Sequence, residues 1–126
     1  MKEFKTNIET DTTDNSDYRH VIFTANHLQL VLMSLQPGEE IGMEAHPATD
    51  QFFRVEEGKG KAIINGNDYL LRTGDCVLIP QGSEHNIINT SKIRQLKLYS
   101  LYSKPMHPDQ VVEPTKADSI KKEGDQ

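Results

Sequence analysis

The stretch covering residues 74–89 constrains the fold of this chain most strongly, because it alternates turns with short apolar runs. The run Cys76–Ile79 is apolar and favours a β-strand. Pro80 fixes its own φ angle and Gly82 can adopt a positive φ, so these two residues predict a tight bend directly after that strand. His85 follows Gly82 by three residues. The bend therefore predicts that the imidazole of His85 leads the next strand and points toward whatever the strands enclose.

The same alternation of short apolar runs and turn residues continues along most of the chain. No segment has the length and pattern of a helix that would contribute to a core. Many short strands at regular spacing are typical of a sandwich or a barrel, so the sequence predicts an all-β fold. The expected strands are Tyr18–Thr24, Leu28–Leu35, Ile41–His46, Gln51–Glu56, Gly60–Asn65, Asp68–Arg72, Cys76–Ile79, His85–Asn89 and Arg94–Tyr102.

Side chains that can bind a metal ion recur upstream of the bend. Alternate residues of a strand point to the same face, so Glu44 and His46 should lie side by side. Gln51 begins the following strand and His85 begins a later one. If Gln51 points the same way as His46, the four side chains converge in the interior. The sequence therefore predicts a site for one divalent metal ion that is built from Glu44, His46, Gln51 and His85.

Two imidazoles and one carboxylate, with open coordination positions, form the facial arrangement that holds Fe(II) and also accepts Zn, Mn, Co or Ni. Here these three ligands would be Glu44, His46 and His85, and they leave the identity of the metal open. Gln51 can offer a carbonyl oxygen, but a neutral amide is a weak ligand. Its side chain is therefore either a direct ligand or a hydrogen-bond donor to a water molecule on the metal.

These residues resemble the paired motifs of the cupin superfamily, whose members are small β-barrels. The second cupin motif, G-x5-P-x-G-x2-H-x3-N, is matched at every defined position by Gly74, Pro80, Gly82, His85 and Asn89. The resemblance implies a double-stranded β-helix, also called a jelly roll, with a metal ion in its interior.

The first cupin motif, G-x5-H-x-H-x3–4-E-x6-G, is matched in part. Gly38 and Gly58 occupy its glycine positions, and His46 occupies the position of its second histidine. Glu44 replaces the first histidine and Gln51 replaces the glutamate, so the expected metal ligands differ from the family pattern. The chain is most similar to small single-domain cupins that are often described as mannose-6-phosphate isomerase-like. That similarity implies an isomerase-like activity on a small molecule.

The motifs lie in one domain that has polar ends. Residues 1–17 predict a flexible arm, residues 18–103 predict the barrel, and residues 104–126 predict a polar and mostly irregular tail. Within that tail, residues 115–118 could begin one short helix that ends near Gly124. His107 could fold over the mouth of the barrel, but its place in a polar tail favours a mobile position.

The strand pattern also divides side chains between the interior and the exterior. Tyr99 and Tyr102 have opposite parity on one strand, so at most one of them can face the interior, and we favour Tyr99. Met43 and Phe52 should point outward, and apolar side chains on an outer face indicate a contact between two copies in a homodimer. The expected lining of the interior pocket is Phe53, Val55, Ile79, Ile87 and Tyr99.

Composition argues against several other classes of function. The chain has 126 residues, which suffice for one core, and a formal net charge of −5, which offers no basic surface to nucleic acid. The polar N-terminus lacks the apolar segment of a signal peptide, and no apolar run is long enough to span a membrane. A single cysteine excludes an internal disulfide and fits a reducing compartment. We therefore expect a cytoplasmic protein whose partner is a small molecule.

Three functions are compatible with this sequence. In the first, an isomerase-like enzyme uses the metal ion to polarise a carbonyl or hydroxyl group of a small sugar-like or carboxylate-bearing molecule. In the second, an Fe(II)-dependent dioxygenase uses the open coordination positions for dioxygen and substrate. In the third, a non-catalytic binding or sensor module holds the metal and the small molecule. The sequence identifies neither the substrate nor the catalytic residues.

Overall fold

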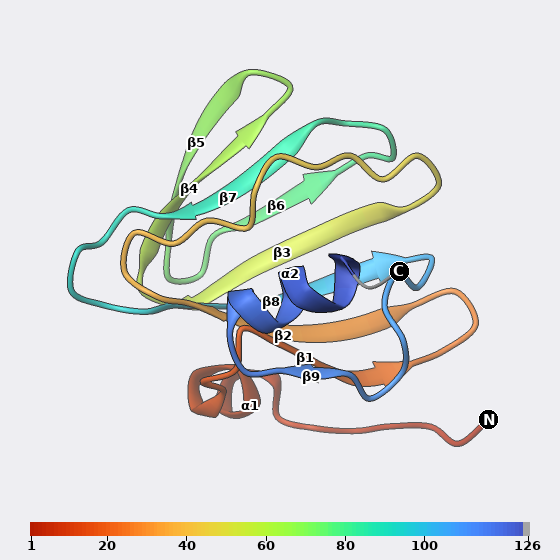
Figure 1. Ribbon diagram of the computed structural model, residues 1–126. Coiled ribbons are helices and arrows are strands. Elements are labelled where there is room, and N and C mark those ends of the chain that lie inside the picture. Colours follow the sequence, from red (N-terminus) through yellow and green to blue (C-terminus); the bar gives the residue numbers. More distant parts are fainter. Residues whose placement is uncertain (125–126) are drawn as a thin grey trace.

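The computed structural model describes residues 1–124, and within this range the chain forms nine strands and two helices. The strands are β1 (Arg19–Thr24), β2 (Gln29–Leu35), β3 (Asp50–Glu57), β4 (Lys59–Ile64), β5 (Asn67–Arg72), β6 (Cys76–Ile79), β7 (His85–Asn89), β8 (Leu96–Ser103) and β9 (Val112–Glu113). They build two antiparallel sheets, one with the order β6-β3-β8-β2-β1-β9 and one with the order β5-β4-β7 (Figure 1). This architecture confirms the all-β, double-stranded β-helix that the sequence predicts.

The interior between the sheets is filled by alternate residues of the strands. On β3 the side chains of Phe53 and Val55 are buried, whereas Arg54 between them is exposed. Ile79 on β6 and Ile87 on β7 are buried in the same apolar cluster. The pleat of a strand imposes this period of two. Four of the five side chains expected to line the interior, those of Phe53, Val55, Ile79 and Ile87, therefore lie in the packed core.

The segment between β2 and β3 differs from the continuous strand that the sequence predicts over Ile41–His46. It pairs with β7 through two isolated bridges, of which one joins Glu44 to His85. Gly42 has a φ of 106°, which lies outside the extended region and interrupts any strand at that point. The alternation of side chains alone could not reveal this break, because glycine carries no side chain to mark it.

The predicted flexible arm, residues 1–17, contains helix α1 (Ile8–Asp14), which packs against β8, β3 and β2. Oδ1 of Asn7 accepts a hydrogen bond from the backbone N–H of Thr10 and so caps the helix. The buried ammonium group of Lys97 donates a hydrogen bond to the backbone oxygen of Asn15 at 2.7 Å. Because a buried charge requires such a partner, this contact attaches the arm to the larger sheet.

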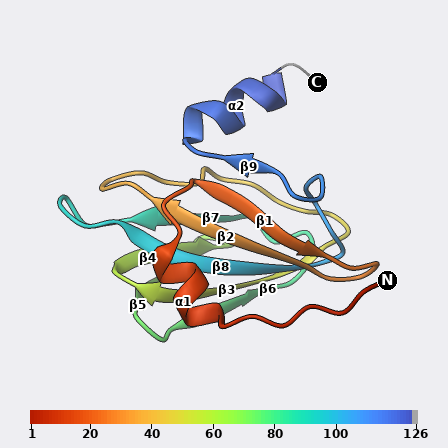
Figure 2. The same ribbon diagram turned by 90° about the horizontal axis from the view of Figure 1, so that it is seen from below.

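The predicted irregular tail contains strand β9 and helix α2 (Lys116–Gly124), which lies beyond β9 at the edge of the larger sheet (Figure 2). Arg19 on β1 forms a buried ion pair with Glu113 at 2.6 Å and donates a hydrogen bond to Oγ of Ser119 at 2.8 Å. These contacts hold the tail against β1. No helix among residues 1–124 is long and apolar enough to cross a membrane.

Asn89, the last residue of the second motif, connects the end of β7 to two other parts of the chain. It is 1% exposed, and its Nδ2 donates hydrogen bonds to the backbone oxygens of Leu35, Gln36 and Arg94 at 3.1, 3.1 and 2.8 Å. Its Oδ1 accepts a hydrogen bond from the backbone N–H of Ser91 at 2.9 Å. A buried amide therefore satisfies backbone groups that would otherwise have no partner.

Replacing this amide by a carboxylate should destabilise the protein strongly. Asn89→Asp keeps the shape of the side chain but turns a donor toward three backbone oxygens into an acceptor, and it buries a charge. We expect the free energy of unfolding to fall by about 3–5 kcal/mol, measured by chemical denaturation. The matched change Asn67→Asp, at an exposed position of β5, should alter it by less than about 0.5 kcal/mol. Equal effects of the two substitutions would contradict this role of Asn89.

Candidate metal centre

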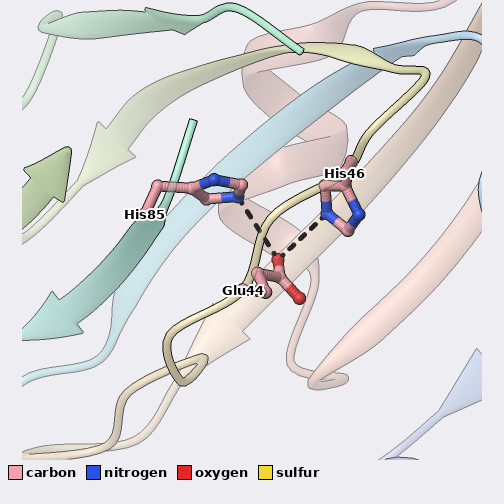
Figure 3. A group of neighbouring side chains, drawn as sticks. All are labelled: Glu44, His46 and His85. Atoms are coloured by element: carbon pink, nitrogen blue, oxygen red, sulfur yellow. Dashed lines mark ion pairs between the residues drawn. The ribbon is translucent and has the colours of Figure 1, made fainter. Parts of the chain in front are cut away.

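Three potential metal ligands meet near the beginning of β7 (Figure 3). Oε1 of Glu44 lies 3.3 Å from Nε2 of His46 and 3.5 Å from Nε2 of His85. One ligand atom of each residue lies within 4.8 Å of the ligand atoms of the other two. A single metal ion could therefore contact all three side chains. The structure thus brings together three of the four residues that the sequence predicts for this site.

Backbone pairing sets the relative position of these residues. Glu44 and His85 exchange two backbone hydrogen bonds, from the N–H of Glu44 at 2.9 Å and from the N–H of His85 at 2.8 Å. The N–H of Gly82, in the bend before β7, donates a hydrogen bond to the backbone oxygen of His46 at 2.8 Å. Gly82 has a φ of 81°, which a glycine adopts without strain. The bend therefore fixes His46 as well as His85.

The hydrogen bond at Nδ1 of His85 determines whether Nε2 of the same ring can bind a metal ion. Nδ1 lies 2.9 Å from the backbone oxygen of Ser83, which can only accept, so Nδ1 carries a proton. In the neutral imidazole, Nε2 then presents a lone pair toward Glu44. Nε2 of His85 and Nε2 of His46 are both buried and have no hydrogen-bond partner. Such an arrangement is unfavourable unless a proton or a metal ion lies among these atoms.

Gln51, the fourth predicted residue, faces the interior and is 3% exposed. It pairs with Tyr102 across β3 and β8. Its Nε2 donates a hydrogen bond to Oγ of Ser100 at 3.0 Å, which orients the amide. Its Oε1 is buried and has no hydrogen-bond partner. The side chain therefore has a free acceptor in the interior of the barrel.

The charges of Glu44 and His85 depend on each other. Burial alone would raise the pKa of Glu44, but the facing imidazoles of His46 and His85 outweigh burial and lower this pKa to about 2. Burial alone would lower the pKa of His85, but the carboxylate of Glu44 and the backbone oxygen of Ser83 raise it above the ordinary value of 6.5. In the metal-free protein, an anionic Glu44 therefore favours a cationic His85. A metal ion would have to replace that proton.

The expectation that Tyr99 lines the interior is wrong, because Tyr102 has that position. Tyr102 is 2% exposed, and its ring makes a T-shaped contact with the ring of His46 at a centroid distance of 6.0 Å. Tyr99 packs against Phe52 on the outer face, with ring centroids 5.9 Å apart. Counting in steps of two from the apolar residues Leu96 and Leu98 leads to Tyr102, so the sequence contained the signal for the correct choice.

His107 also lies at the site, although its place in a polar tail favours a mobile position. Its Nε2 is 3.3 Å from Oη of Tyr102, and the two rings are in edge contact at a centroid distance of 5.2 Å. No local pattern in the tail predicts this placement. It depends on hydrogen bonds to Gln29, which is distant in sequence and belongs to β2.

Comparisons with known proteins agree with this architecture. A family model described as a cupin domain matches residues 31–102. The uncharacterized protein YrkC of Bacillus subtilis (strain 168) is 41% identical over 125 residues, which cover 94% of this chain and 67% of YrkC. The chain thus spans about two thirds of the length of this relative. The crystal structure of BH2720 from Bacillus halodurans is similar with a TM-score of 0.92 and 42% identity, and the match covers 95% of each chain.

A more distant similarity connects the chain to an enzyme. Quercetin 2,3-dioxygenase of Bacillus subtilis (strain 168) is 29% identical over 84 residues. The match covers 67% of this chain and 25% of the dioxygenase. The similarity is therefore confined to a part of that enzyme.

Removing the charge of Glu44 should lower the pKa of His85 in the metal-free protein. Glu44→Gln deletes the carboxylate that stabilises the imidazolium, whereas burial of His85 remains. The pKa can be measured by NMR titration of the imidazole protons. The exposed substitution Glu57→Gln serves as the control and should leave the pKa of His85 unchanged. An unchanged pKa in Glu44→Gln would contradict the interaction.

The interaction between Glu44 and His85 should make the stability of the metal-free protein depend on pH. The lowered pKa of Glu44 contributes stability above pH 4.5, and this contribution is lost as the pH falls toward 2. The raised pKa of His85 contributes stability below pH 6.5, and this contribution is lost as the pH rises through the folded-state pKa. The contribution of the pair is therefore largest between pH 4.5 and 6.5. In Glu44→Gln, the melting temperature should therefore change less with pH than it does in the wild type, as measured by thermal melts at a series of pH values.

Proposed function

The chain belongs to the cupin family, and we propose that it binds one divalent metal ion through Glu44, His46 and His85. The metal-bound form would act on a small sugar-like or carboxylate-bearing molecule in an isomerase-like manner. One observation carries the metal-binding part of this proposal: Oε1 of Glu44 and the buried Nε2 atoms of the two histidines converge, with no hydrogen-bond partner for either nitrogen. Zn, Fe, Mn, Ni and Co are all compatible with this set of ligands.

The spacing of the three atoms fits a metal ion better than a shared proton. Zn–N and Zn–O bonds of about 2.0–2.2 Å in tetrahedral geometry place neighbouring ligand atoms roughly 3.3 Å apart. The carboxylate oxygen of Glu44 lies 3.3 and 3.5 Å from the two nitrogens. Charge-assisted hydrogen bonds between an imidazolium and a carboxylate are shorter, at about 2.7–2.9 Å. The bond between Nδ1 of His85 and the backbone oxygen of Ser83 is also typical of a histidine that binds a metal.

Gln51 also fits the proposed metal site. Its side chain would be either a fourth ligand or a hydrogen-bond partner of a water molecule on the metal. Its Nε2 is occupied by Ser100, so the amide presents its unpartnered Oε1 to the interior. Amide oxygens are weak ligands compared with carboxylates. Loss of Gln51 should therefore affect metal binding less than loss of Glu44 does.

The charge of the loaded site indicates the kind of small molecule that it would accept. One carboxylate and two neutral imidazoles leave a divalent ion with a net charge of +1 at the site, which attracts an anionic oxygen donor. The side chain of Glu44 is 32% exposed, so the site is open to solvent on that side. When bound, the metal ion would polarise a carbonyl or hydroxyl group of such a molecule.

A dioxygenase is the second candidate, and two observations favour it. Two histidines and one carboxylate form the ligand set of non-haem Fe(II) oxygenases. The partial similarity to quercetin 2,3-dioxygenase points to the same chemistry. In this function the metal ion would be Fe(II).

A homodimer and a cytoplasmic location stay predictions. An apolar groove of about 500 Å³ lies on the outer side of β6, β3 and β8, and its lining includes Phe52, Leu78 and Leu101. Met43, the other residue expected at a dimer contact, is 57% exposed. A second copy of the chain is the occupant that we expect for this apolar surface.

Metal analysis tests the proposed ligands directly. Protein isolated without chelators should contain about one divalent metal ion per chain, and Glu44→Ala or His85→Ala should weaken metal binding on the order of tenfold or more. Metal content can be measured by elemental analysis, and affinity by titration of the metal-free protein. The exposed changes Glu57→Ala and His27→Ala are matched controls and should have no effect. Full metal content in both Glu44→Ala and His85→Ala would refute the proposed centre.

Oxygen uptake separates the two candidate functions. We expect the Fe(II)-loaded protein to consume no dioxygen above background if the isomerase-like function is correct. Flavonols and small carboxylates are suitable test substrates, and an oxygen electrode measures the rate. Uptake that depends on substrate and disappears in His85→Ala would instead establish the dioxygenase.

A further inference from the structure

The chain after β8 is fixed across the structure at three places. We call residues 104–111 the strap. Oγ1 of Thr49 donates a hydrogen bond to the backbone oxygen of Lys104 at 3.3 Å. Gln29 on β2 binds the middle of the strap, and the N–H of Val21 donates to the backbone oxygen of Val111 at 2.9 Å. The strap is therefore attached to β1, to β2 and to Thr49, the residue before β3.

Gln29 is used almost entirely to hold the strap. It is completely buried, with an exposed fraction of 0%. Its Oε1 accepts hydrogen bonds from the backbone N–H groups of Met106 and His107, each at 3.0 Å. Its Nε2 donates to the backbone oxygen of His107 at 2.7 Å and to Oγ1 of Thr24 at 3.0 Å. A buried amide with all its capacity used in this way specifies where the strap lies.

The position of the strap places His107 against Tyr102. The ring of Tyr102 makes edge contacts with two imidazoles, those of His46 and His107. Oη of Tyr102 and Nε2 of His107 are 3.3 Å apart. Tyr102 therefore contacts both the candidate metal ligand His46 and His107 of the strap.

The contact between Tyr102 and His107 can form one hydrogen bond, whose direction depends on the tautomer of the imidazole. Burial and the nearby charge of Arg19 lower the pKa of His107 to about 4. A neutral imidazole can accept a hydrogen bond from the hydroxyl group or donate one to it. The hydroxyl group of Tyr102 has one proton, and this proton is available to a ligand only when the Nε2–H of His107 donates to Oη of Tyr102.

We propose that Tyr102 and His107 form the second half of the ligand site. The hydroxyl group of Tyr102 contacts a small anionic oxygen donor, such as a carboxylate, that is bound to the metal ion. His107 is a positioning residue that orients this hydroxyl group and is itself placed by Gln29. This inference rests on the metal binding proposed above. The net positive charge of the loaded site and the hydroxyl group beside it favour a small anion with an oxygen ligand atom.

The Co(II)-loaded protein tests this inference with acetate as the probe. Acetate that binds at the metal changes the visible absorption of Co(II), so its dissociation constant can be measured by titration. Tyr102→Phe retains the ring against His46 but removes the hydroxyl group. It should weaken acetate binding about tenfold, as expected for a lost hydrogen bond to a charged ligand. Tyr99→Phe, on the opposite face of the same strand, is the matched control and should have no effect.

A double-mutant cycle tests the role of His107. His107→Gln should also weaken acetate binding, but in the Tyr102→Phe background it should add little, because it acts through the hydroxyl group. His27→Gln, an exposed histidine in the turn before β2, is the matched control. A purely structural effect of His107→Gln would persist in the absence of the hydroxyl group, and such additivity would overturn the positioning role. If Tyr102→Phe fails to fold, His107→Gln and His107→Asn must still weaken acetate binding without lowering the affinity for Co(II).

The possible failures are distinguishable. If the wild-type protein does not bind Co(II), the proposed metal centre is wrong. If it binds Co(II) but acetate produces no spectral change, or if Tyr102→Phe binds acetate as well as the wild type, the metal centre stands and the present inference is wrong.

Discussion

The pairing of Glu44 with His85 through two backbone hydrogen bonds is the constraint on which the candidate site depends. The segment that carries Glu44 and His46 is irregular and includes a glycine in the left-handed region, so it does not belong to either sheet. Its attachment to β7 gives its side chains a defined place. Because the attachment uses backbone groups, the side chains of Glu44 and His85 stay available to each other and to a metal ion.

Much of the fold was predictable from the sequence, and the reasons are local. Short apolar runs between turn residues define strands, and the bend at Pro80 and Gly82 places His85 at the beginning of one of them. The matching spacing of both motifs identified the family without reference to distant contacts. Asn89 shows why such a motif can be recognised at all. Its amide binds three backbone oxygens from two separate segments, so its chemical identity is dictated by geometry.

The parts that the sequence did not reveal depend on contacts between distant residues. Helix α1 lies within a polar arm, and its attachment depends on the buried Lys97 of β8. The position of His107 depends on Gln29, some eighty residues earlier. The choice between Tyr99 and Tyr102 is different, because parity counted from the buried Leu96 and Leu98 would have given the correct residue. Counting from the buried end of a strand is thus more reliable than judging each aromatic residue by itself.

Gln29 holds the strap by its backbone and makes no hydrogen bond to the side chains of Met106 or His107. These hydrogen bonds can form with any side chain at positions 106 and 107. Proline is the exception, because it lacks the backbone N–H that Gln29 binds. The location of the residue at position 107 is therefore independent of its chemistry. Substitution at that one position could present an acid, an amide or an aliphatic group to the same point beside Tyr102 while the backbone stays in place. The barrel thereby has an exchangeable position next to Tyr102, which itself contacts the candidate metal ligand His46, so the surroundings of the candidate site could change without rebuilding the fold.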